Sequence, residues 1–241
     1  MSDQYMNDQY HKLAQFYDDF VQKNRNYHKI ATELAKLIGE ARDILDIGIG
    51  TGIVVEHLLQ IQPAYKITGI DTSESLLEQA ENKLGKTVDL HCQNVSELDL
   101  GKQFDVVYSR GGAWTFVNDQ VETMLASHIL GLTEIQKSFD RVAKHLKPDG
   151  LLIISSSNAY GDNLVELENG IVHKRIAHTE GNEDERYTIL DYLFYQNEKL
   201  LAEQKLKLRL ISYQTTTTML SQANFVEESI KAETYFIYRK I

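Results

Sequence analysis

The sequence has almost no cysteine, which limits how the fold can be stabilised. Cys92 is the single cysteine among 241 residues, and no Cys/His cluster has the spacing of a zinc site. An internal disulfide is therefore excluded, and the pattern favours a reduced compartment. We expect a cytoplasmic protein whose functional site holds no metal.

Long apolar runs and excess positive charge are also missing. No stretch approaches the ~18 consecutive apolar residues of a membrane-spanning helix, and the first residues lack the basic and apolar regions of a signal peptide. With 25 Lys and Arg against 35 Asp and Glu, the formal net charge is -10. A basic stripe that could neutralise phosphates is not expected. We therefore predict a soluble protein without a nucleic-acid or membrane partner.

Proline is scarce too, and no linker or internal repeat divides the chain. Only two prolines occur, Pro63 and Pro148, and the hydrophobic fraction is 42%. A chain of this length and composition can bury one sizeable core without disulfides or metals. A single domain over residues 1–241 is the expectation.

Short apolar runs that alternate with helical patterns fill the first two thirds of the chain. Apolar residues at helical spacing predict helices, and brief apolar runs predict buried strands. The predicted helices are residues 27–38, a helix from about Ile53, 75–84 and 132–146, and the predicted strands are 43–47, 66–70, 88–92, 104–109 and 151–155. Lys147–Gly150 fits a type I turn before the last of these strands. Such apolar strands predict an α/β fold whose parallel sheet is covered on both faces.

The pattern changes after Ser157. Residues 171–178, 186–196 and 205–211 alternate or are rich in aromatic and β-branched residues, which predicts three antiparallel strands that could roof a ligand site. A short helix near 217–223 follows. Two last strands are predicted at residues 225–230 and 234–240. Asn224 is well placed for a left-handed cap after the helix.

A loop with three glycines follows the first predicted strand. In a doubly wound sheet, ligands bind beyond the carboxyl ends of the strands, where Gly48, Gly50 and Gly52 fall. The dinucleotide fingerprint requires glycine or alanine where this chain has Ile53, and a P-loop requires a lysine after its last glycine. The loop therefore predicts a nucleotide-like ligand without a pyrophosphate.

Asp46–Gly52 resembles motif I, D/E-x-G-x-G-x-G, of the class I S-adenosylmethionine-dependent methyltransferases. Further resemblances follow in order: Asp71 at the end of the second strand, Phe104–Val107 as FDxV, Leu146–Gly150 as LKPGG, and a closing strand pair after Ala223-Asn224-Phe225. Together they cover residues 43–155 and 215–241. The resemblance implies a Rossmann-like, seven-stranded, doubly wound sheet that is mostly parallel, with an antiparallel C-terminal hairpin. It also implies S-adenosylmethionine as cofactor and S-adenosylhomocysteine as product.

The same resemblance implies a set of cofactor-binding residues. Asp71 corresponds to the acid that binds the ribose hydroxyls, and Asn94 stands where relatives carry an Asp toward the adenine amine; its amide oxygen can still accept that hydrogen bond. The full set is Tyr17, Tyr27, Asp46, Gly48, Gly50, Thr51, Gly52, Asp71, Thr72, Asn94, Val95 and Ser109.

The N-terminal segment narrows the type of enzyme that the chain resembles. Residues 15–20, followed by Asn26 and Tyr27, resemble the YD…Y pattern of small-molecule methyltransferases, including the amino-sugar and glycine N-methyltransferase types. This implies Tyr17 as a catalytic candidate over cofactor and substrate; a packed helix aromatic is the alternative. Residues 108–114 lack a (D/N)PP(Y/F) motif, which disfavours nucleobase or glutamine N-methylation.

Candidate residues for proton transfer and acceptor binding follow the fourth strand and the fifth. Many small-molecule relatives carry a histidine after strand four, usually nearer the strand, where this chain has Thr115; His128 is our candidate for the general base, with a loop or cap role as the alternative. The candidates for substrate contact are Arg110, Trp114 and Tyr160, each of which could instead anchor a loop. His173 and His178 could face the site from the inserted strands.

These expectations combine into one hypothesis. We expect an N-terminal helical lid over residues 1–40, a cofactor-binding core over 41–157, an antiparallel insertion over 165–212, and a closing helix and strand pair over 213–241. The predicted function is in-line transfer of a methyl group to N or O of a small metabolite, by a monomer or homodimer. A peptide or protein methyltransferase, or a catalytically silent cofactor-binding partner protein, remains an alternative.

Overall fold

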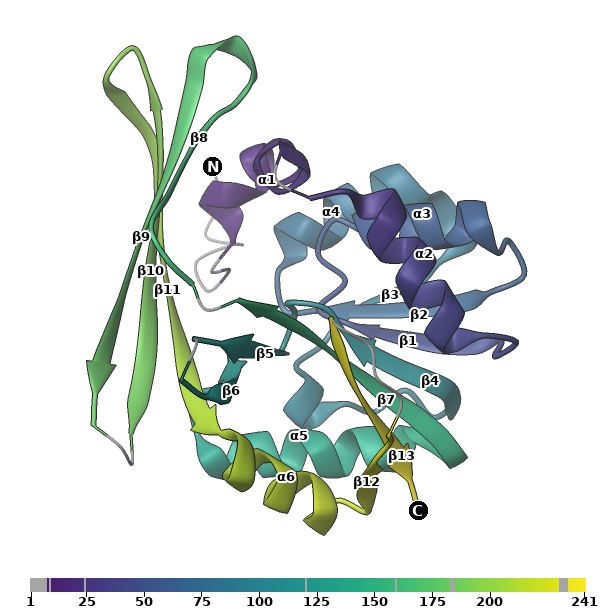
Figure 1. Cartoon of the computed structure of the whole chain (residues 1–241). Helices are drawn as coiled ribbons and strands as arrows, with labels where there is room; N and C mark the ends of the chain where they lie inside the picture. The colour runs from purple at the N-terminus through teal and green to yellow at the C-terminus, as the bar shows by residue number, and fades with distance from the viewer. Residues whose placement is uncertain are drawn as a thin grey trace.

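Two sheets joined by one long strand form the frame of the molecule (Figure 1). The structure is a computed structural model, which describes residues 8, 10–23, 25–119, 121–158, 160–182, 185–229 and 234–241. Its helices are α1 (His11–Lys23), α2 (Tyr27–Ile38), α3 (Ile53–Ile61), α4 (Glu74–Leu84), α5 (Leu132–His145) and α6 (Tyr213–Gln222).

The first sheet is the doubly wound sheet that the sequence predicts. Its seven strands lie in the order β3, β2, β1, β4, β7, β13, β12, and the first five run parallel. The last two, which are antiparallel to their neighbours, form the C-terminal hairpin. The strands are β1 (Asp43–Ile47), β2 (Lys66–Asp71), β3 (Asp89–Cys92), β4 (Phe104–Ser109), β7 (Leu146–Asn158), β12 (Phe225–Glu227) and β13 (Tyr235–Lys240). Ile230, the end of one predicted strand, lies outside the described residues.

Helices cover both faces of this sheet, as its apolar strands require. Alternate residues of β1 point to opposite faces: Ile44 packs with α2, α3 and α4, and Leu45 packs with α5 and α6. Figure 1 shows these two helical layers above and below the sheet. The carboxyl ends of β1, β2 and β4 are left facing α1, and this edge is where the site lies.

The second sheet contains strands that the sequence analysis missed. It continues from the end of β7 through β5 and β6, a hairpin, to β11, β10, β9 and β8. Four inserted strands, rather than three, lie in residues 163–212, and Figure 1 shows them as a tall sheet beside α1. The strands are β5 (Trp114–Asn118), β6 (Thr123–Ser127), β8 (Asn163–Glu166), β9 (Ile171–Gly181), β10 (Arg186–Gln196) and β11 (Lys199–Ser212). The hairpin escapes prediction because its two strands are only five residues long and are buried on both faces, so they show no alternation of polar and apolar residues.

Two local predictions have clear outcomes. Asn224 has φ 63, which confirms the left-handed cap after α6. The type I turn at Lys147–Gly150 is wrong, because Asp149 at the third turn position has φ 61, whereas a type I turn requires a negative φ there. In this loop the aspartate adopts the left-handed conformation itself.

Helix α1 packs between the two sheets. Leu13 is fully buried against the inserted strands, and Phe16 stacks on Phe194 with 4.7 Å between ring centroids. Val21 packs instead against Tyr27 and Ile53 at the start of α3. Residues 1–7 of the predicted lid lie outside the described residues. Within the described chain, no helix is both long and apolar enough to cross a membrane.

Candidate active site

The glycine loop is shaped by a close approach of two backbones. Gly48, Gly50 and Gly52 have φ of 75, 57 and 74 degrees, which favours glycine at each position. A Cβ on Gly48 would lie 2.3 Å from the Cα of Gly112, and a Cβ on Gly112 would lie 2.1 Å from the carbonyl oxygen of Ile47. The loop after β4 therefore presses directly on the glycine loop, and both glycines are required for the contact.

Asp71, at the end of β2, fixes the same loop from the other side. Its Oδ2 accepts a hydrogen bond from the Gly50 N–H at 2.8 Å, and its Oδ1 accepts one from the Ser73 N–H at 2.9 Å. Burial raises the pKa of Asp71, although these hydrogen bonds oppose the shift. Each carboxylate oxygen keeps a lone pair, so the group can still accept hydrogen bonds from a ligand.

A cavity of about 500 Å³ opens beside this loop, and we call it the glycine-loop cavity. Its volume is in the range of sites for small ligands and cofactors. The sequence-predicted residues that line it are Tyr17, Gly48, Gly50, Asp71, Thr72, Asn94, Val95 and His128. A Cβ on Gly50 would find only Tyr17 Cε1, at 4.0 Å, so the loop leaves open space where a ligand backbone or sulfur would pass.

Asn94 lines this cavity but does not offer its amide oxygen to a ligand. Asn94 Oδ1 accepts hydrogen bonds from the Ser96 N–H and the Ser96 hydroxyl, both at 3.0 Å. It caps the short 3-10 helix Val95–Glu97, and both lone pairs of the oxygen are used. The amide nitrogen remains as a donor toward the cavity, and an interaction of Asn94 with the adenine stays a prediction.

A second cavity of about 110 Å³ lies under α1 and the inserted strands, and we call it the lid cavity. The sequence-predicted residues that line it are Tyr17, Tyr27, Asp46, Gly48, Gly50, Thr51, Arg110, His128 and Tyr160. It is also lined by polar residues that the sequence analysis did not single out: Tyr10, Arg25, Arg175 and Tyr192. The extra residues lie in or next to α1, β9 and β10 and share no sequence spacing, so no motif could have found them.

Tyr10, Tyr17 and His128 line both cavities and mark where they meet. The Tyr10 hydroxyl lies 3.4 Å from His128 Nε2, and the rings of Tyr10 and Tyr17 meet edge to face at 6.2 Å. Burial lowers the pKa of His128 to about 4, so its imidazole is neutral near pH 7. Burial also raises the pKa of Tyr17, which keeps this phenol protonated.

The position of His128 depends on the hairpin β5–β6. The hairpin leaves β4 and returns, so that the His128 N–H donates to the Ala113 carbonyl at 3.1 Å. His128 thus lies beside the end of β4, although it is many residues away in sequence. Thr115, where the family pattern would place a histidine, is buried and bonded to Ser155 instead.

Asp46 is a buried carboxyl group of the lid cavity. It is 4% exposed, and its Oδ2 accepts a hydrogen bond from the Tyr108 hydroxyl at 2.7 Å. Burial raises its pKa to about 7, against the opposing effect of the Tyr108 hydrogen bond. Near neutral pH the group is therefore only partly charged.

Three sequence-predicted site residues do not line either cavity. Trp114 is fully buried in the core against Phe139, with 4.9 Å between ring centroids, which excludes the predicted substrate contact. Ser109 is also fully buried, and its hydroxyl bonds to the Trp114 backbone rather than to a ligand. Gly52 lies under the loop, where a Cβ would meet Leu84, so its role is conformational. Of the inserted histidines, His178 is exposed and His173 is buried against Phe20.

The lid helix is fastened to the glycine loop by one carboxylate. Asp18 Oδ1 accepts a hydrogen bond from the Thr51 hydroxyl at 2.5 Å, and Asp18 Oδ2 pairs with Lys83 of α4. Before α1, Asp8 accepts hydrogen bonds from the Ser73 and Ser75 hydroxyls at 2.9 and 2.6 Å. The lid is therefore bound to the elements that form the glycine-loop cavity.

Comparison with known proteins relates this geometry to a family. Residues 44–150 match the model of the methyltransferase domain family. The chain is 31% identical over 114 residues to a malonyl-[acyl-carrier protein] O-methyltransferase of Bacillus cereus, covering 47% of this chain and 36% of that protein. It is 27% identical over 150 residues to a dTDP-3-amino-3,6-dideoxy-alpha-D-glucopyranose N,N-dimethyltransferase of Streptomyces fradiae, covering 59% and 52%. The chain spans from about a third to about half of the length of such curated relatives.

Solved structures share the fold over nearly the whole chain. DesVI of Streptomyces venezuelae has a TM-score of 0.68 at 19% identity, covering 95% of this chain and 98% of its own. An S-adenosylmethionine-dependent methyltransferase of Clostridium acetobutylicum has a TM-score of 0.69 at 20% identity, covering 96% and 98%. At these identities the likeness concerns the fold. The match to the methyltransferase domain covers residues 44–150, which hold the glycine loop, Asp71 and His128.

Proposed function

We propose that this protein is an S-adenosylmethionine-dependent methyltransferase that methylates N or O of a small metabolite. The observation that carries the proposal is the meeting of the two cavities at Tyr10, Tyr17 and His128. The glycine-loop cavity has the volume and donor set for the cofactor, and the lid cavity can hold an acceptor. Two matched relatives have names that specify an O-methyltransferase and an N,N-dimethyltransferase, which supports both acceptor atoms as candidates.

The chain's own residues would orient the reactants and exclude water. Bound S-adenosylmethionine supplies an electrophilic methyl group that an acceptor lone pair can attack in line. Asp71 would accept hydrogen bonds from the ribose hydroxyls, and Gly50 leaves space for the chain that carries the sulfur. Helix α1 covers this point with Tyr10 and Tyr17, and such positioning in a dry site can supply most of the catalysis.

His128 would receive the proton that an amine or hydroxyl acceptor loses. Because its pKa is lowered to about 4, the imidazole is neutral at working pH and has one ring nitrogen with a free lone pair. The Tyr10 hydroxyl, 3.4 Å away, would orient this ring. Methylation would leave the acceptor nitrogen or oxygen with one surplus proton, and this proton would pass to His128.

Isothermal titration with S-adenosylhomocysteine, followed by methyl transfer from labelled cofactor to a metabolite extract, tests the proposal. We expect binding and a labelled small product that is lost in His128→Ala. Alkaline treatment separates methyl esters, which release methanol, from N-methyl products, which do not. Absence of binding by the folded protein would refute the proposal. Binding without any transfer would indicate a silent partner protein, and label only on polypeptides would indicate a protein methyltransferase.

A further inference from the structure

The lid cavity gathers positive charge in a protein whose formal net charge is -10. Arg25, Arg110 and Arg175 all line it. In the part of the chain that the structure describes, no Asp or Glu lies within ion-pair distance of any of the three. Elsewhere, arginines do find such partners: Arg186 pairs with Glu122 at 2.7 Å. Among the described residues, none of the three cavity arginines forms an ion pair, although Arg110 interacts at longer range with Asp46.

The acidic group of the cavity cannot neutralise these arginines. Among the described lining residues, the carboxyl group is that of Asp46, which is buried and accepts a hydrogen bond from Tyr108. Its pKa of about 7 leaves it only partly ionised at neutral pH. His128 adds no negative charge. The cavity is therefore cationic, and it favours a ligand of opposite charge.

Arg175 is held by two tyrosines of the lid cavity, and Arg25, which forms a hydrogen bond with Tyr27, interacts with the same two tyrosines through its charge. The guanidinium of Arg175 lies 5.8 Å from the ring centre of Tyr160 and forms a hydrogen bond with Tyr192. Both tyrosines also interact electrostatically with Arg25, which follows α1. Arg175 is further oriented by a hydrogen bond from its Nε to the Gly161 carbonyl at 2.9 Å. Arg25 and Arg175 thus reach the lid cavity from two distant segments of the chain.

Arg110 follows β4 and shares Tyr27 with Arg25, but it also interacts with the buried Asp46. It lies 5.4 Å from the ring centre of Tyr27 and interacts with Asp46 at the end of β1. This position is beside the glycine loop, where the carboxylate of a bound cofactor's amino-acid tail would be closest. Arg110 is therefore not counted with Arg25 and Arg175 as a ligand of the acceptor.

We propose that the methyl acceptor is an anion whose carboxylate or phosphate is held by Arg25 and Arg175 between Tyr160 and Tyr192. This inference rests on the proposed function. A guanidinium presents five donors in a planar fork that matches carboxylate and phosphate oxygens, and tyrosine hydroxyls can add further donors. The acidic exterior disfavours anions in general, so the arginines select an anion only once it enters the cavity. The acceptor atom of the same molecule then lies toward His128.

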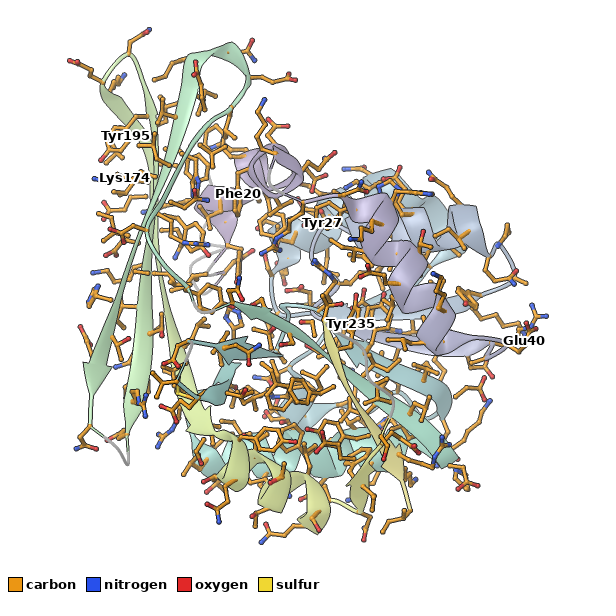
Figure 2. The ribbon with its side chains drawn as sticks, in the orientation of Figure 1. Phe20, Tyr27, Glu40, Lys174, Tyr195 and Tyr235 are labelled. Atoms are coloured by element: carbon orange, nitrogen blue, oxygen red, sulfur yellow. The ribbon has the colours of Figure 1, made fainter. Side chains whose placement is uncertain are left out.

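The test compares two substitutions on the same strand. Arg175→Gln removes a cavity charge, and Lys174→Gln is the matched control, because Lys174 is exposed on the side of β9 that faces away from α1 (Figure 2). A metabolite extract is separated on an anion exchanger at pH 8, and each fraction is assayed with methyl-labelled S-adenosylmethionine. We expect wild-type protein and Lys174→Gln to label acceptors in the retained fraction. In Arg175→Gln, KM for that fraction rises at least tenfold while kcat changes little, since the anchor lies away from the reacting atoms.

Measuring S-adenosylhomocysteine binding distinguishes the results that would contradict this inference from those that would contradict the proposed function. We expect Arg175→Gln to bind S-adenosylhomocysteine as wild type does; if its affinity falls in parallel with its activity, Arg175 holds the cofactor carboxylate and the inference is wrong. Label that appears only in the unretained fraction also overturns it, while leaving the methyltransferase function intact. Wild-type protein that does not bind S-adenosylhomocysteine contradicts the proposed function itself. Phosphatase treatment of the retained fraction then distinguishes a phosphate, whose acceptor activity is lost, from a carboxylate.

Discussion

The glycine-loop cavity and the lid cavity are built from different parts of the polypeptide. The first is shaped by backbone: positive φ angles at glycines, N–H groups that bond to Asp71, and the contact of Gly48 with Gly112. The second is shaped by side chains that α1, β9, β10 and the loop after β7 bring together. Backbone geometry leaves short motifs in a sequence, and converging side chains leave none. This difference explains why the cofactor can be predicted from the sequence and the acceptor cannot.

Gly112→Ala should have the largest effect, because it should distort the glycine-loop cavity. Its new Cβ would lie 2.1 Å from the Ile47 carbonyl oxygen, so the loop after β4 must move away from the glycine loop. We expect loss of detectable S-adenosylhomocysteine binding by calorimetry and a large fall in Tm. Gly161→Ala is the control, because a Cβ there meets nothing within 4 Å. Wild-type affinity in Gly112→Ala would show that the contact does not shape the cavity.

Asp71→Ala should lower cofactor affinity without unfolding the protein. The substitution removes the carboxylate that accepts from Gly50 and Ser73 and that would bind the ribose hydroxyls. Hydrogen bonds to charged groups contribute about 1.5–3 kcal/mol each, so we expect a loss of affinity of about 100-fold or more. Calorimetry measures it, with the exposed Asp99→Ala as control. An unchanged Kd would refute the assignment of Asp71 to the cofactor.

Asp18→Asn tests how helix α1 is attached to the glycine loop and to α4. The amide loses the ion pair with Lys83 but keeps an oxygen for the Thr51 hydroxyl, so α1 remains in place with a weaker hold. We expect roughly tenfold weaker S-adenosylhomocysteine binding, corresponding to about 1.4 kcal/mol. The neighbouring Asp19→Asn should have no effect. Equal affinities in the two variants would mean that the lid contributes nothing to cofactor binding.

His173→Phe should produce the smallest effect, an increase in stability. His173 is 1% exposed, and its two ring nitrogens have no hydrogen-bond partner among the described residues. Its ring stacks on Phe20 and packs at a tilt against Phe194. Replacing an unsatisfied buried polar ring by an apolar ring of similar shape should add about 1 kcal/mol, or a few degrees in Tm. A lower Tm would mean that the imidazole forms a stabilising contact.

The gain from His173→Phe should also depend on pH. Burial, with a smaller effect of Arg175, lowers the pKa of His173 to about 4, below its usual value near 6.5. Between these values the unfolded chain binds the proton and the folded chain does not, so wild-type stability falls as pH decreases from 6.5 toward 4. The phenylalanine variant lacks this loss. We therefore expect a larger Tm difference at pH 5 than at pH 7, and a constant difference would contradict the assignment.

Sequence reasoning predicted most of the first sheet because each strand there is apolar and each turn carries a motif. Asp71 and the glycine loop fall where the spacing placed them. The cap that Asn94 forms over Ser96 was not predicted, because it depends on local rotamers. Trp114 and Ser109 were assigned to the site because they follow or end β4, and only the unforeseen hairpin shows that they are buried.

The sequence predicted the lid-cavity residues that lie in the family motifs or follow strands four and five, such as Tyr17, Arg110 and Tyr160, but not Arg25 and Arg175. Arg25 and Arg175 are 150 positions apart, and nothing in the sequence between them indicates that they share Tyr160 and Tyr192. Their convergence depends on how the second sheet is placed beside α1 (Figure 1). Long-range packing of this kind leaves no periodic signal in a single sequence.

Strand β7 belongs to both sheets, because its first part and its last part pair with different strands. Residues 146 and 151–155 pair with β4 or β13 in the first sheet, whereas residues 156–158 pair with β5 in the second. Insertions or substitutions between Asn163 and Ser212 can therefore reshape the lid cavity while every residue pair of the first sheet is kept. A fold arranged in this way allows the lid cavity to change during evolution while the glycine-loop cavity keeps its shape.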